Sequence, residues 1–529
     1  MRSIPIRHSS RSLRDGFSDD SNEALAVKTV NDVVDLAKRH WDDPRAVAAA
    51  IRSKDHTLSV SKEIRTVAVY YWQLGCGGAD EVARTQLKTL AALGFNTVLI
   101  TDNPVPQGTL DELGNPPHCL LATSQGMRPE EYTQRANAFD RCLTDNHVDA
   151  LIYNQWLCDT ALWEMLIAKL HSIPVAVCMH GVYSFPLIEL WKTTDFAQRL
   201  VELPSTLSLA EAIICASTAD KAFWSRRNPN VFLTRYKSPF ALNASEDNIG
   251  ATEQNSVDPN AAGIGYEDAA TSAPRIVWIG RIAEEKRPLD AVRILAKVKQ
   301  RVPDAVLDMV GPGEGDWAEL VRQEADNLEV SDSVIMHGGQ SDVARFYEKA
   351  SLYLHTSATE SYCLSLLEAK SWGLPCVMYE LPFLELAKNG THGGVESVAH
   401  RDVDAAANAC ASILENPQLR IKLGKAAQDD VAPILRFDET AFWKEVIDSF
   451  KQERVLPALS EGDSLADDAF RIAYTNAIDD LRARIQMLER RATEAEASLN
   501  EIRSSTTFKA GKILLGIPTR IKDAIRSRR

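Results

Sequence analysis

Residues 352–375 read LYLHTSATESYCLSLLEAKSWGLP. An apolar run, LYLHTS, is followed by a short loop that contains Glu360, and then by a helical stretch that begins near Cys363 and includes Glu368. A buried strand that passes through a short loop into a helix is the repeating unit of a parallel α/β sheet. In such a sheet the loop lies at the carboxyl end of the strand, where ligands bind.

Similar apolar runs recur on both sides of this stretch, in two blocks. The amino-terminal block holds TVAVYYW, NTVLIT, DALIYNQW, PVAVCMH and EAIICAS, and the carboxyl-terminal block holds RIVWIG, AVLDMVG, SVIMHGG, LYLHTS and PCVMYE. A polar, acidic segment over residues 242–273 separates them. The sequence therefore predicts an α/β protein with two doubly wound Rossmann-like domains that face a cleft, and that cleft would be the natural ligand site.

The expected organisation has six parts. They are an amino-terminal helical extension (1–60), a first Rossmann-like domain (61–241), a flexible linker or insert (242–273), a second Rossmann-like domain (274–455), a linker with a coiled coil (456–504) and a basic amphipathic tail (505–529). The coiled coil is predicted because apolar residues from Ile478 to Ile502 alternate spacings of four and three; one helix lying on the body is the alternative. The tail predicts an interfacial helix on anionic lipid, or else a disordered basic segment.

Composition limits the class of protein. The 529 residues carry a net charge of −14, which argues against a nucleic-acid partner because phosphate contacts need clustered Lys and Arg. The nine cysteines are scattered singly, a pattern that favours reduced thiols over a disulfide framework. We see no secretory signal and no apolar run that approaches the roughly 20 residues needed to span a bilayer. The expected location is therefore cytoplasmic, with possible peripheral contact to the inner face of the cell membrane.

A glycine-rich turn follows the first apolar run, in QLGCGGADEV (73–82). Gly75, Gly77 and Gly78 stand between a strand and a helix, where free backbone N–H groups favour a diphosphate. The next strand ends at Asp102, which at first suggests a dinucleotide fold with an acid for the ribose. However, Asp80 replaces the third glycine of that motif, so the turn predicts a phosphate but not which phosphate ester.

The second block adds charges that a nicotinamide site does not need. WIGRIAEEKRP places Arg281 and Lys286 in one loop, where two cations can neutralise a diphosphate. The step from Glu360 to Glu368 is roughly 12 Å along a helix, near the reach of a sugar nucleotide from hexose to ribose. The helix start between the two acids offers N–H donors and a positive dipole end to the diphosphate.

GRIAEEKRP, followed by the Glu-x7-Glu spacing in ESYCLSLLEAKSWGLP, resembles the retaining glycosyltransferases of family four, which have two Rossmann domains in the GT-B arrangement. The resemblance covers about residues 65–450. It implies a nucleotide-sugar donor, UDP- or GDP-linked, as substrate, transfer with retention and no obligatory metal or cofactor. The domain over 61–241 would then take the acceptor and that over 274–455 the donor nucleotide.

The resemblance also implies roles for matching positions. Arg281 and Lys286 would hold the diphosphate, Glu360 would contact the donor sugar and Glu368 the ribose. His180, in VAVCMHG, would face the reacting sugar. Together with Arg281, Lys286 and Glu360, it makes up the catalytic set.

Backbone groups complete the implied donor site. Gly77 and Gly78, in GGADEV, would approach the phosphates through their backbone. The helix start would offer its N–H groups from the remaining donor-contacting positions, Ser361, Tyr362, Cys363 and Leu364.

The sequence departs from the family pattern at three places. Cys363 stands where a glycine is usual, YKSPFALNAS (236–245) replaces the usual interdomain PNG, and LPFLELAKNGTHGG (381–394) lacks the paired glycines that usually precede it. These departures bear on donor identity more than on reaction type. The DVD at 402–404 precedes a helical stretch and is better explained by capping than by metal binding. We find no His/Cys/Asp/Glu group with metal-ligand spacing, and we expect no metal site.

The expected chemistry is stabilisation of the leaving diphosphate by the two cations and the helix start. The resemblance implies that an acceptor hydroxyl attacks from the same face. The basic tail resembles that of some bacterial cell-surface polysaccharide transferases, which favours a glycan or lipid-linked acceptor at a membrane surface. The coiled coil would permit a homo-oligomer. Two alternatives stay open: an NAD-dependent oxidoreductase, and a non-catalytic dimeric scaffold with a transferase fold.

Overall fold

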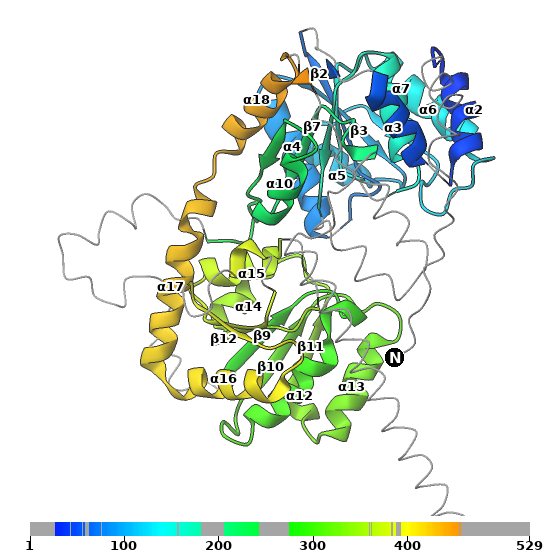
Figure 1. Ribbon diagram of the computed structural model, residues 1–529. Coiled ribbons are helices and arrows are strands. Elements are labelled where there is room, and N and C mark those ends of the chain that lie inside the picture. The colour runs from blue at the N-terminus through cyan, green and yellow to red at the C-terminus, as the bar shows by residue number, and fades with distance from the viewer. Residues whose placement is uncertain are drawn as a thin grey trace, which may run out of the picture. The chain divides into compact units, whose positions relative to one another are not determined.

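The computed structural model describes residues 27–42, 44–54, 57–58, 63–75, 77–155, 158–180, 206–242, 274–358, 360, 362–381, 384–387, 393–452 and 454–455 (Figure 1). The chain divides into two compact units, Met1–Ile472 and Ala473–Arg529, and all of the described residues lie in the first. The predicted coiled coil and basic tail lie outside the described residues, as does Ser361. Among the described residues, no helix is both long enough and apolar enough to cross a membrane.

The amino-terminal sheet has seven parallel strands in the order β4-β3-β2-β5-β6-β7-β8. They are β2 (Thr66–Tyr70), β3 (Asn96–Thr101), β4 (His118–Leu120), β5 (Ala150–Tyr153), β6 (Val175–Cys178), β7 (Ala212–Cys215) and β8 (Val231–Leu233). The connecting helices are α4 (Gly78–Ala92), α5 (Gln107–Glu112), α6 (Tyr132–Asp145), α7 (Ala161–Leu170) and α10 (Thr218–Ser225). The order reverses beside β2, as in a doubly wound sheet.

Both faces of this sheet are covered, which explains its continuous apolar strands. Ala68 and Tyr70 of β2 join a buried cluster with residues of α6 and α7, whereas Val67 and Val69 join a cluster on the other face with residues of α4. Successive strand residues point to opposite faces, so a strand covered on both sides needs no polar alternation.

The amino-terminal extension forms two helices, α2 (Val30–His40) and α3 (Pro44–Lys54). The α2 helix begins at a capping box, in which Thr29 accepts from the Asp32 amide and Asp32 accepts from the Thr29 amide. It packs on α6 and α7, and Trp41 just beyond its end lies parallel to Trp163 with ring centroids 6.5 Å apart.

The second sheet has six parallel strands in the order β11-β10-β9-β12-β13-β14. They are β9 (Arg275–Ile279), β10 (Val306–Val310), β11 (Val334–Gly338), β12 (Leu352–His355), β13 (Cys376–Tyr379) and β14 (Val395–Val398). Its helices are α12 (Pro288–Val298), α13 (Trp317–Asn327), α14 (Ala344–Lys349), α15 (Leu364–Ser371) and α16 (Val403–Glu415). Two parallel, Rossmann-like α/β sheets are therefore confirmed.

The chain then returns to the first sheet, which the sequence analysis did not anticipate. After the long helix α17 (Pro417–Leu435), helix α18 (Glu439–Ser449) contacts α4. Phe442 and Trp443 of α18 are buried in the same cluster as Val67 and Val69 of β2. The last described strand, β15 (Arg454–Val455), pairs antiparallel with β1 (Thr57–Leu58), close to the start of the first sheet.

The expectation of reduced cysteines is wrong for one pair. Cys119 and Cys142 form a disulfide with their Cα atoms 6.2 Å apart, which joins the edge strand β4 to helix α6. Their separation of 23 residues does not indicate in the sequence that they pair. The fold brings them together because α6 packs beside the β4 edge. The other six described cysteines are free thiols.

Candidate active site

The centre of the candidate site is an ion pair between Lys286 and Glu360. Lys286 ends the short 3₁₀ turn η3 (Glu284–Lys286) that follows β9, and Glu360 lies in the loop after β12. The Lys286 Nζ lies 2.6 Å from Glu360 Oε1. Thr356 Oγ1 at the end of β12 donates to the Lys286 carbonyl at 2.8 Å, so the two loops are fastened together at the carboxyl edge of the sheet.

Two further groups converge on the same carboxylate oxygen. His355 Nε2 lies 3.0 Å and Ser357 Oγ 2.8 Å from Glu360 Oε1. None of these contacts uses Oε2, the second carboxylate oxygen. His355 was not predicted as a site residue, although its position at the end of a strand shortly before Glu360 was a usable signal.

The charges of this pair are fixed by each other. Burial opposes ionisation of Glu360, but the Lys286 ammonium and His355 hold the pKa of this carboxyl well below its usual range. Burial likewise opposes the charge of Lys286, and the Glu360 carboxylate raises the pKa of the lysine above its usual value. The site therefore presents a carboxylate and an ammonium at neutral pH.

Arg281 lies on the same loop as Lys286 but is more accessible. Its side chain is 57% exposed and makes ion pairs with Glu285 at 2.6 Å and Glu314 at 2.5 Å. Ion pairs at the protein surface contribute little to the free energy of folding. An incoming anion can therefore replace either carboxylate as the partner of Arg281 at a small cost in free energy. This geometry is compatible with the predicted contact to a diphosphate.

The helix α15 begins directly after these groups. Its N-cap is Cys363, which adopts the left-handed conformation with φ of 64°, a conformation that favours glycine. The usual family glycine at this position therefore has a conformational reason. Leu364 opens the helix, whose first N–H groups lack intrahelical partners and can receive an anion.

Glu368, one turn into α15, is buried and held by two hydroxyl groups. Ser238 Oγ donates to its Oε1, and Tyr347 OH donates to its Oε2 at 2.6 Å. Burial raises the pKa of Glu368. The predicted ribose contact would therefore share each oxygen with a hydroxyl already in place. Ser238 comes from the segment that replaces the family's interdomain motif, and the sequence analysis gave it no role.

His180 follows β6 and is held by an amide pair. Its Nε2 lies 2.7 Å from Asn154 Oδ1, and Asn154 exchanges hydrogen bonds with Gln86 at 3.1 and 2.8 Å. Because Asn154 Oδ1 also accepts from Gln86, it acts as the acceptor toward His180, so Nε2 carries the proton. Burial lowers the pKa of His180 to about 4, so the imidazole is neutral at pH 7.

Aromatic contacts connect His180 with the loop that contains Glu360. The His180 ring lies nearly parallel to the Tyr236 ring, with centroids 6.1 Å apart. Tyr236 in turn meets Tyr362 edge to face, with centroids 5.2 Å apart. Ring contacts thereby link the histidine after β6 of the first sheet to the loop before α15 of the second.

The glycine turn before α4 is filled by a side chain of its own. Asp80 accepts from the Gly75 amide at 2.8 Å and from the Gly77 amide at 2.6 Å. A Cβ atom at Gly77 would lie 2.4 Å from Asp80 Oδ2, and one at Gly78 would lie 3.3 Å from Leu364 Cδ1. A side chain at Gly77 would displace the Asp80 carboxylate from its amide contacts, whereas one at Gly78 would press on Leu364 only slightly. The predicted approach of both glycines to phosphate stays a prediction.

Asp102 is not available to bind a ribose. It is buried and accepts from Arg135 Nη1 at 2.7 Å and from the amide and hydroxyl of Ser124 at 2.8 and 2.7 Å. Arg135 is also paired with Glu164 at 2.6 Å. The acid that the NAD interpretation requires is therefore part of a buried ion-pair network.

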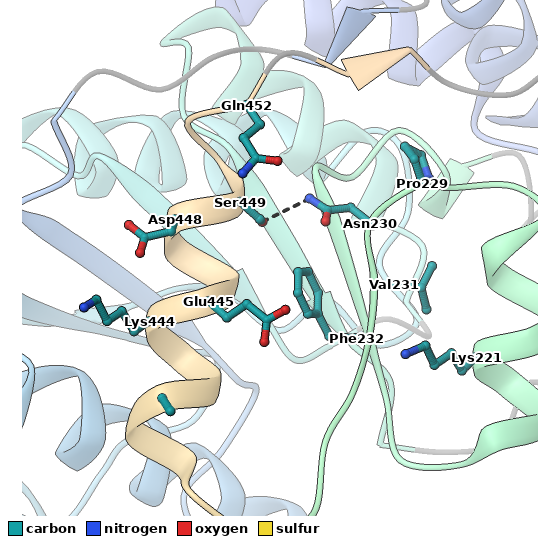
Figure 2. A pocket seen from close by; sticks show the side chains of 11 residues that line it. Lys221, Pro229, Asn230, Val231, Phe232, Lys444, Glu445, Asp448, Ser449 and Gln452 are labelled. Carbon is teal, nitrogen blue, oxygen red and sulfur yellow. Dashed lines mark hydrogen bonds between the residues drawn. The ribbon is translucent and has the colours of Figure 1, made fainter.

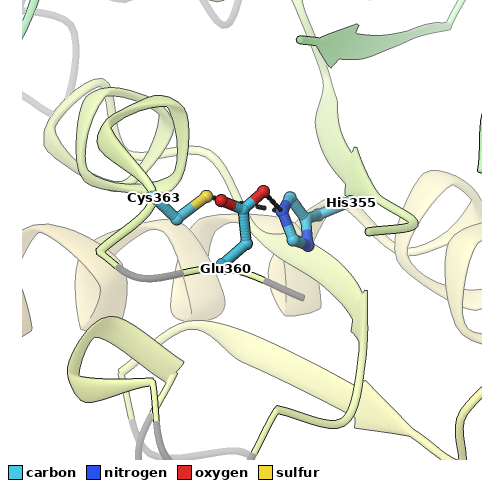
Figure 3. A group of neighbouring side chains, drawn as sticks. All are labelled: His355, Glu360 and Cys363. Atoms are coloured by element: carbon cyan, nitrogen blue, oxygen red, sulfur yellow. Dashed lines mark hydrogen bonds and ion pairs between the residues drawn. The ribbon is translucent and has the colours of Figure 1, made fainter. Parts of the chain in front are cut away.

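His355, Glu360 and Cys363 come together more closely than the sequence analysis expected. Their possible ligand atoms all lie within 4.8 Å of one another. Figure 3 shows the three side chains side by side. Their spacing in the sequence is not that of a metal motif, because the strand end and the helix start that bring these residues together are separated by a loop. This is a group of the kind that can hold a metal ion.

A separate groove of about 600 Å³ lies between β8, α10 and α18 (Figure 2). Its charged side chains are two lysines, Lys221 and Lys444, and two acids, Glu445 and Asp448. Figure 2 also shows the hydrogen bond of 3.0 Å from Asn230 Nδ2 to Ser449 Oγ that joins its two walls. None of the predicted site residues lines this groove, and its mixed charges do not converge on one point.

Comparison with known proteins places the second sheet in a family. Residues 267–430 match the family described as glycosyl transferases group 1. N-acetyl-alpha-D-glucosaminyl L-malate synthase of Bacillus anthracis is 29% identical over 173 residues, which cover 32% of this chain and 44% of that protein. Poly(glycerol-phosphate) alpha-glucosyltransferase of Bacillus subtilis is 28% identical over 155 residues, which cover 29% of this chain and 22% of that protein. The chain thus spans less than half the length of either relative.

The fold has close counterparts among solved structures. Anabaena HepE in complex with UDP and glucose aligns with a TM-score of 0.54 and 17% identity, over 74% of this chain and all of that one. At this identity the likeness concerns the fold, which is the GT-B arrangement of two Rossmann-like sheets. Arg281, Lys286, Glu360 and Glu368 all lie within the matched residues 267–430. By this match, residues 267–430 of the chain are similar to the group 1 glycosyl transferases.

Proposed function

We propose that this protein is a retaining glycosyltransferase that moves a sugar from a nucleotide donor to a hydroxyl group. The observation that carries the proposal is the Lys286–Glu360 pair at the carboxyl edge of the second sheet, directly before the start of α15. A cation, a sugar-binding acid and a helix N-terminus in this order suit a diphosphate with a sugar at one end.

The chemistry follows from the charges of these groups. Lys286 and Arg281 neutralise the diphosphate, and with the start of α15 they stabilise the charge that grows on the leaving phosphate. The Oε2 atom of Glu360, which takes none of the contacts given above from described residues, accepts from hydroxyls of the donor sugar, while Glu368 accepts from the ribose. The backbone of Gly77 is expected to lie near the phosphates.

His180 serves as a hydrogen-bonding group and not as a cation. With Nε2–H committed to Asn154, the neutral ring offers the Nδ1 lone pair to a sugar hydroxyl. The acceptor hydroxyl attacks from the face that the diphosphate leaves, and a phosphate oxygen of the departing group takes its proton. No residue of the chain then needs to act as a separate base.

Three finer features of the proposal rest on the sequence. The acceptor is a glycan or a lipid-linked acceptor of bacterial cell-surface polysaccharide synthesis. The basic tail at 505–529 binds the inner face of the cell membrane, and the coiled coil joins copies of the chain. Liposome flotation of the full chain and of a variant ending at residue 504 tests the tail. An equal membrane-bound fraction for both would remove this part of the proposal.

A nucleotide-release assay tests the activity. Wild-type protein is incubated with a panel of UDP- and GDP-linked sugars, starting with UDP-glucose, and free nucleoside diphosphate is measured with and without a lipid-linked glycan fraction. We expect release from one donor, with acceptor-dependent stimulation, and its loss in Lys286→Ala. Release from no donor, or equal release by that variant, would contradict the proposal.

A further inference from the structure

Three side chains of different chemistry meet where β12 passes into α15. His355 is the last residue of β12, Glu360 lies in the following loop and Cys363 is the N-cap of α15. His355 Nε2 lies 3.4 Å from Cys363 Sγ and 3.0 Å from Glu360 Oε1. Figure 3 shows the thiol, the carboxylate and the imidazole directed toward one another.

This spacing fits the coordination shell of a soft divalent cation. Zinc binds thiolate, imidazole and carboxylate tetrahedrally at about 2.3, 2.0 and 2.0 Å, which places neighbouring ligand atoms about 3.3–3.7 Å apart. The two printed separations lie close to that range, and all three ligand atoms lie within 4.8 Å of one another. Small side-chain rotations are therefore enough to place three ligands on one ion.

The ligand set also selects the kind of metal. One thiolate and one imidazole favour zinc and its substitute cobalt over magnesium or calcium, which prefer oxygen ligands. Three protein ligands leave the fourth position of a tetrahedron open to water, as in zinc sites that are not purely structural.

We propose that His355, Glu360 and Cys363 form an inhibitory site for Zn²⁺ at the donor-binding edge of the second sheet. Zinc on Glu360 Oε1, the oxygen 3.0 Å from His355 Nε2, competes with the Lys286 ammonium that lies 2.6 Å from the same oxygen, because the two positive charges repel each other. Lys286 is thereby separated from Glu360, and Glu360 is held by the ion. The loss of donor binding rests on the proposed function, whereas binding of the ion does not.

Cobalt titration tests the site without any enzymatic readout. Co²⁺ is added to reduced full-length protein, and thiolate-to-cobalt charge-transfer absorbance is recorded, followed by displacement with Zn²⁺. We expect one equivalent of Co²⁺ with this absorbance in the wild type, its loss in Cys363→Gly and weaker binding in His355→Gln. The matched control Cys158→Ser removes another free thiol and should keep the signal.

Lys286→Met gives a second, opposite prediction. Removing the competing ammonium should tighten Co²⁺ binding at least several-fold while the donor site loses its cation. No thiolate absorbance in the wild type, its persistence in Cys363→Gly, or weaker Co²⁺ binding in Lys286→Met would overturn the site.

Inhibition is measured separately, as release of UDP from UDP-glucose at increasing Zn²⁺. We expect Zn²⁺ to suppress release by the wild type in the concentration range in which it displaces Co²⁺. Full release by zinc-loaded protein would overturn the inhibitory role. If no donor is turned over even without zinc, the proposed function fails, and the cobalt titration still decides whether the ion binds.

Discussion

The largely buried His180 imidazole should make the stability of the protein depend on pH. Its pKa in the folded state is lowered to about 4 by burial, against about 6.5 for an exposed histidine. The unfolded chain therefore takes up a proton more readily, so stability is lost as the pH falls below about 6.5, and this loss is complete near pH 4. Integration of the difference in bound protons gives a loss of about 2 kcal/mol at pH 5.

The perturbation is His180→Gln, and the assay is urea unfolding of wild type and variant at about pH 7.5 and about pH 5. The variant should lose about 2 kcal/mol less than the wild type between the two pH values. Effects of the substitution that do not depend on pH, such as a changed contact to Asn154, cancel in this difference. The replacement of exposed His147 by Asn serves as the control and should keep the wild-type difference. Equal pH dependence in the wild type and His180→Gln would refute the reasoning.

Three further predictions concern contacts that are visible in the structure but not in the sequence. Asp102→Asn should destabilise the protein by about 3 kcal/mol, because it breaks a buried pair with Arg135. NADH should bind neither the wild type nor the variant. A variant with changed nucleotide binding and unchanged stability would contradict this prediction. Loss of the Cys119–Cys142 bond in Cys119→Ser should lower the free energy of unfolding by about 3 kcal/mol in urea without a reducing agent, as expected for a loop of this length. A reducing agent should lower the urea midpoint of the wild type to that of the variant. Asp80→Ala should cost about 1 kcal/mol through loss of the capping contacts at the start of α4, again by urea unfolding, and unchanged stability would show that those contacts are not needed.

The sequence was sufficient for the two sheets. Continuous apolar runs such as TVAVYYW occur only where both faces of a strand are covered, and β2 is buried on both. It was also sufficient for the position of Glu360, because a loop after a buried strand must lie at the carboxyl edge of a parallel sheet.

What could not be predicted depends on contacts between distant segments. The apolar face of α18, with Phe442 and Trp443, shows that the helix packs on something, but not that it returns to the first sheet. Asp102 looked like a ribose acid because its partner Arg135 lies on a helix 33 residues away. The spacing of residues along the chain does not show which distant residues come into contact.

The most direct test of the account is binding of the donor to the Lys286–Glu360 pair. Isothermal titration compares UDP-glucose, UDP and NADH on the wild type, on Lys286→Ala and on Lys349→Ala, an exposed lysine of the second domain that serves as the control. The account predicts that UDP-glucose binds the wild type and Lys349→Ala equally, that Lys286→Ala loses about tenfold or more in affinity through one charge-assisted contact, and that NADH does not bind. Unchanged affinity in Lys286→Ala, or binding of NADH in place of UDP-glucose, would contradict it.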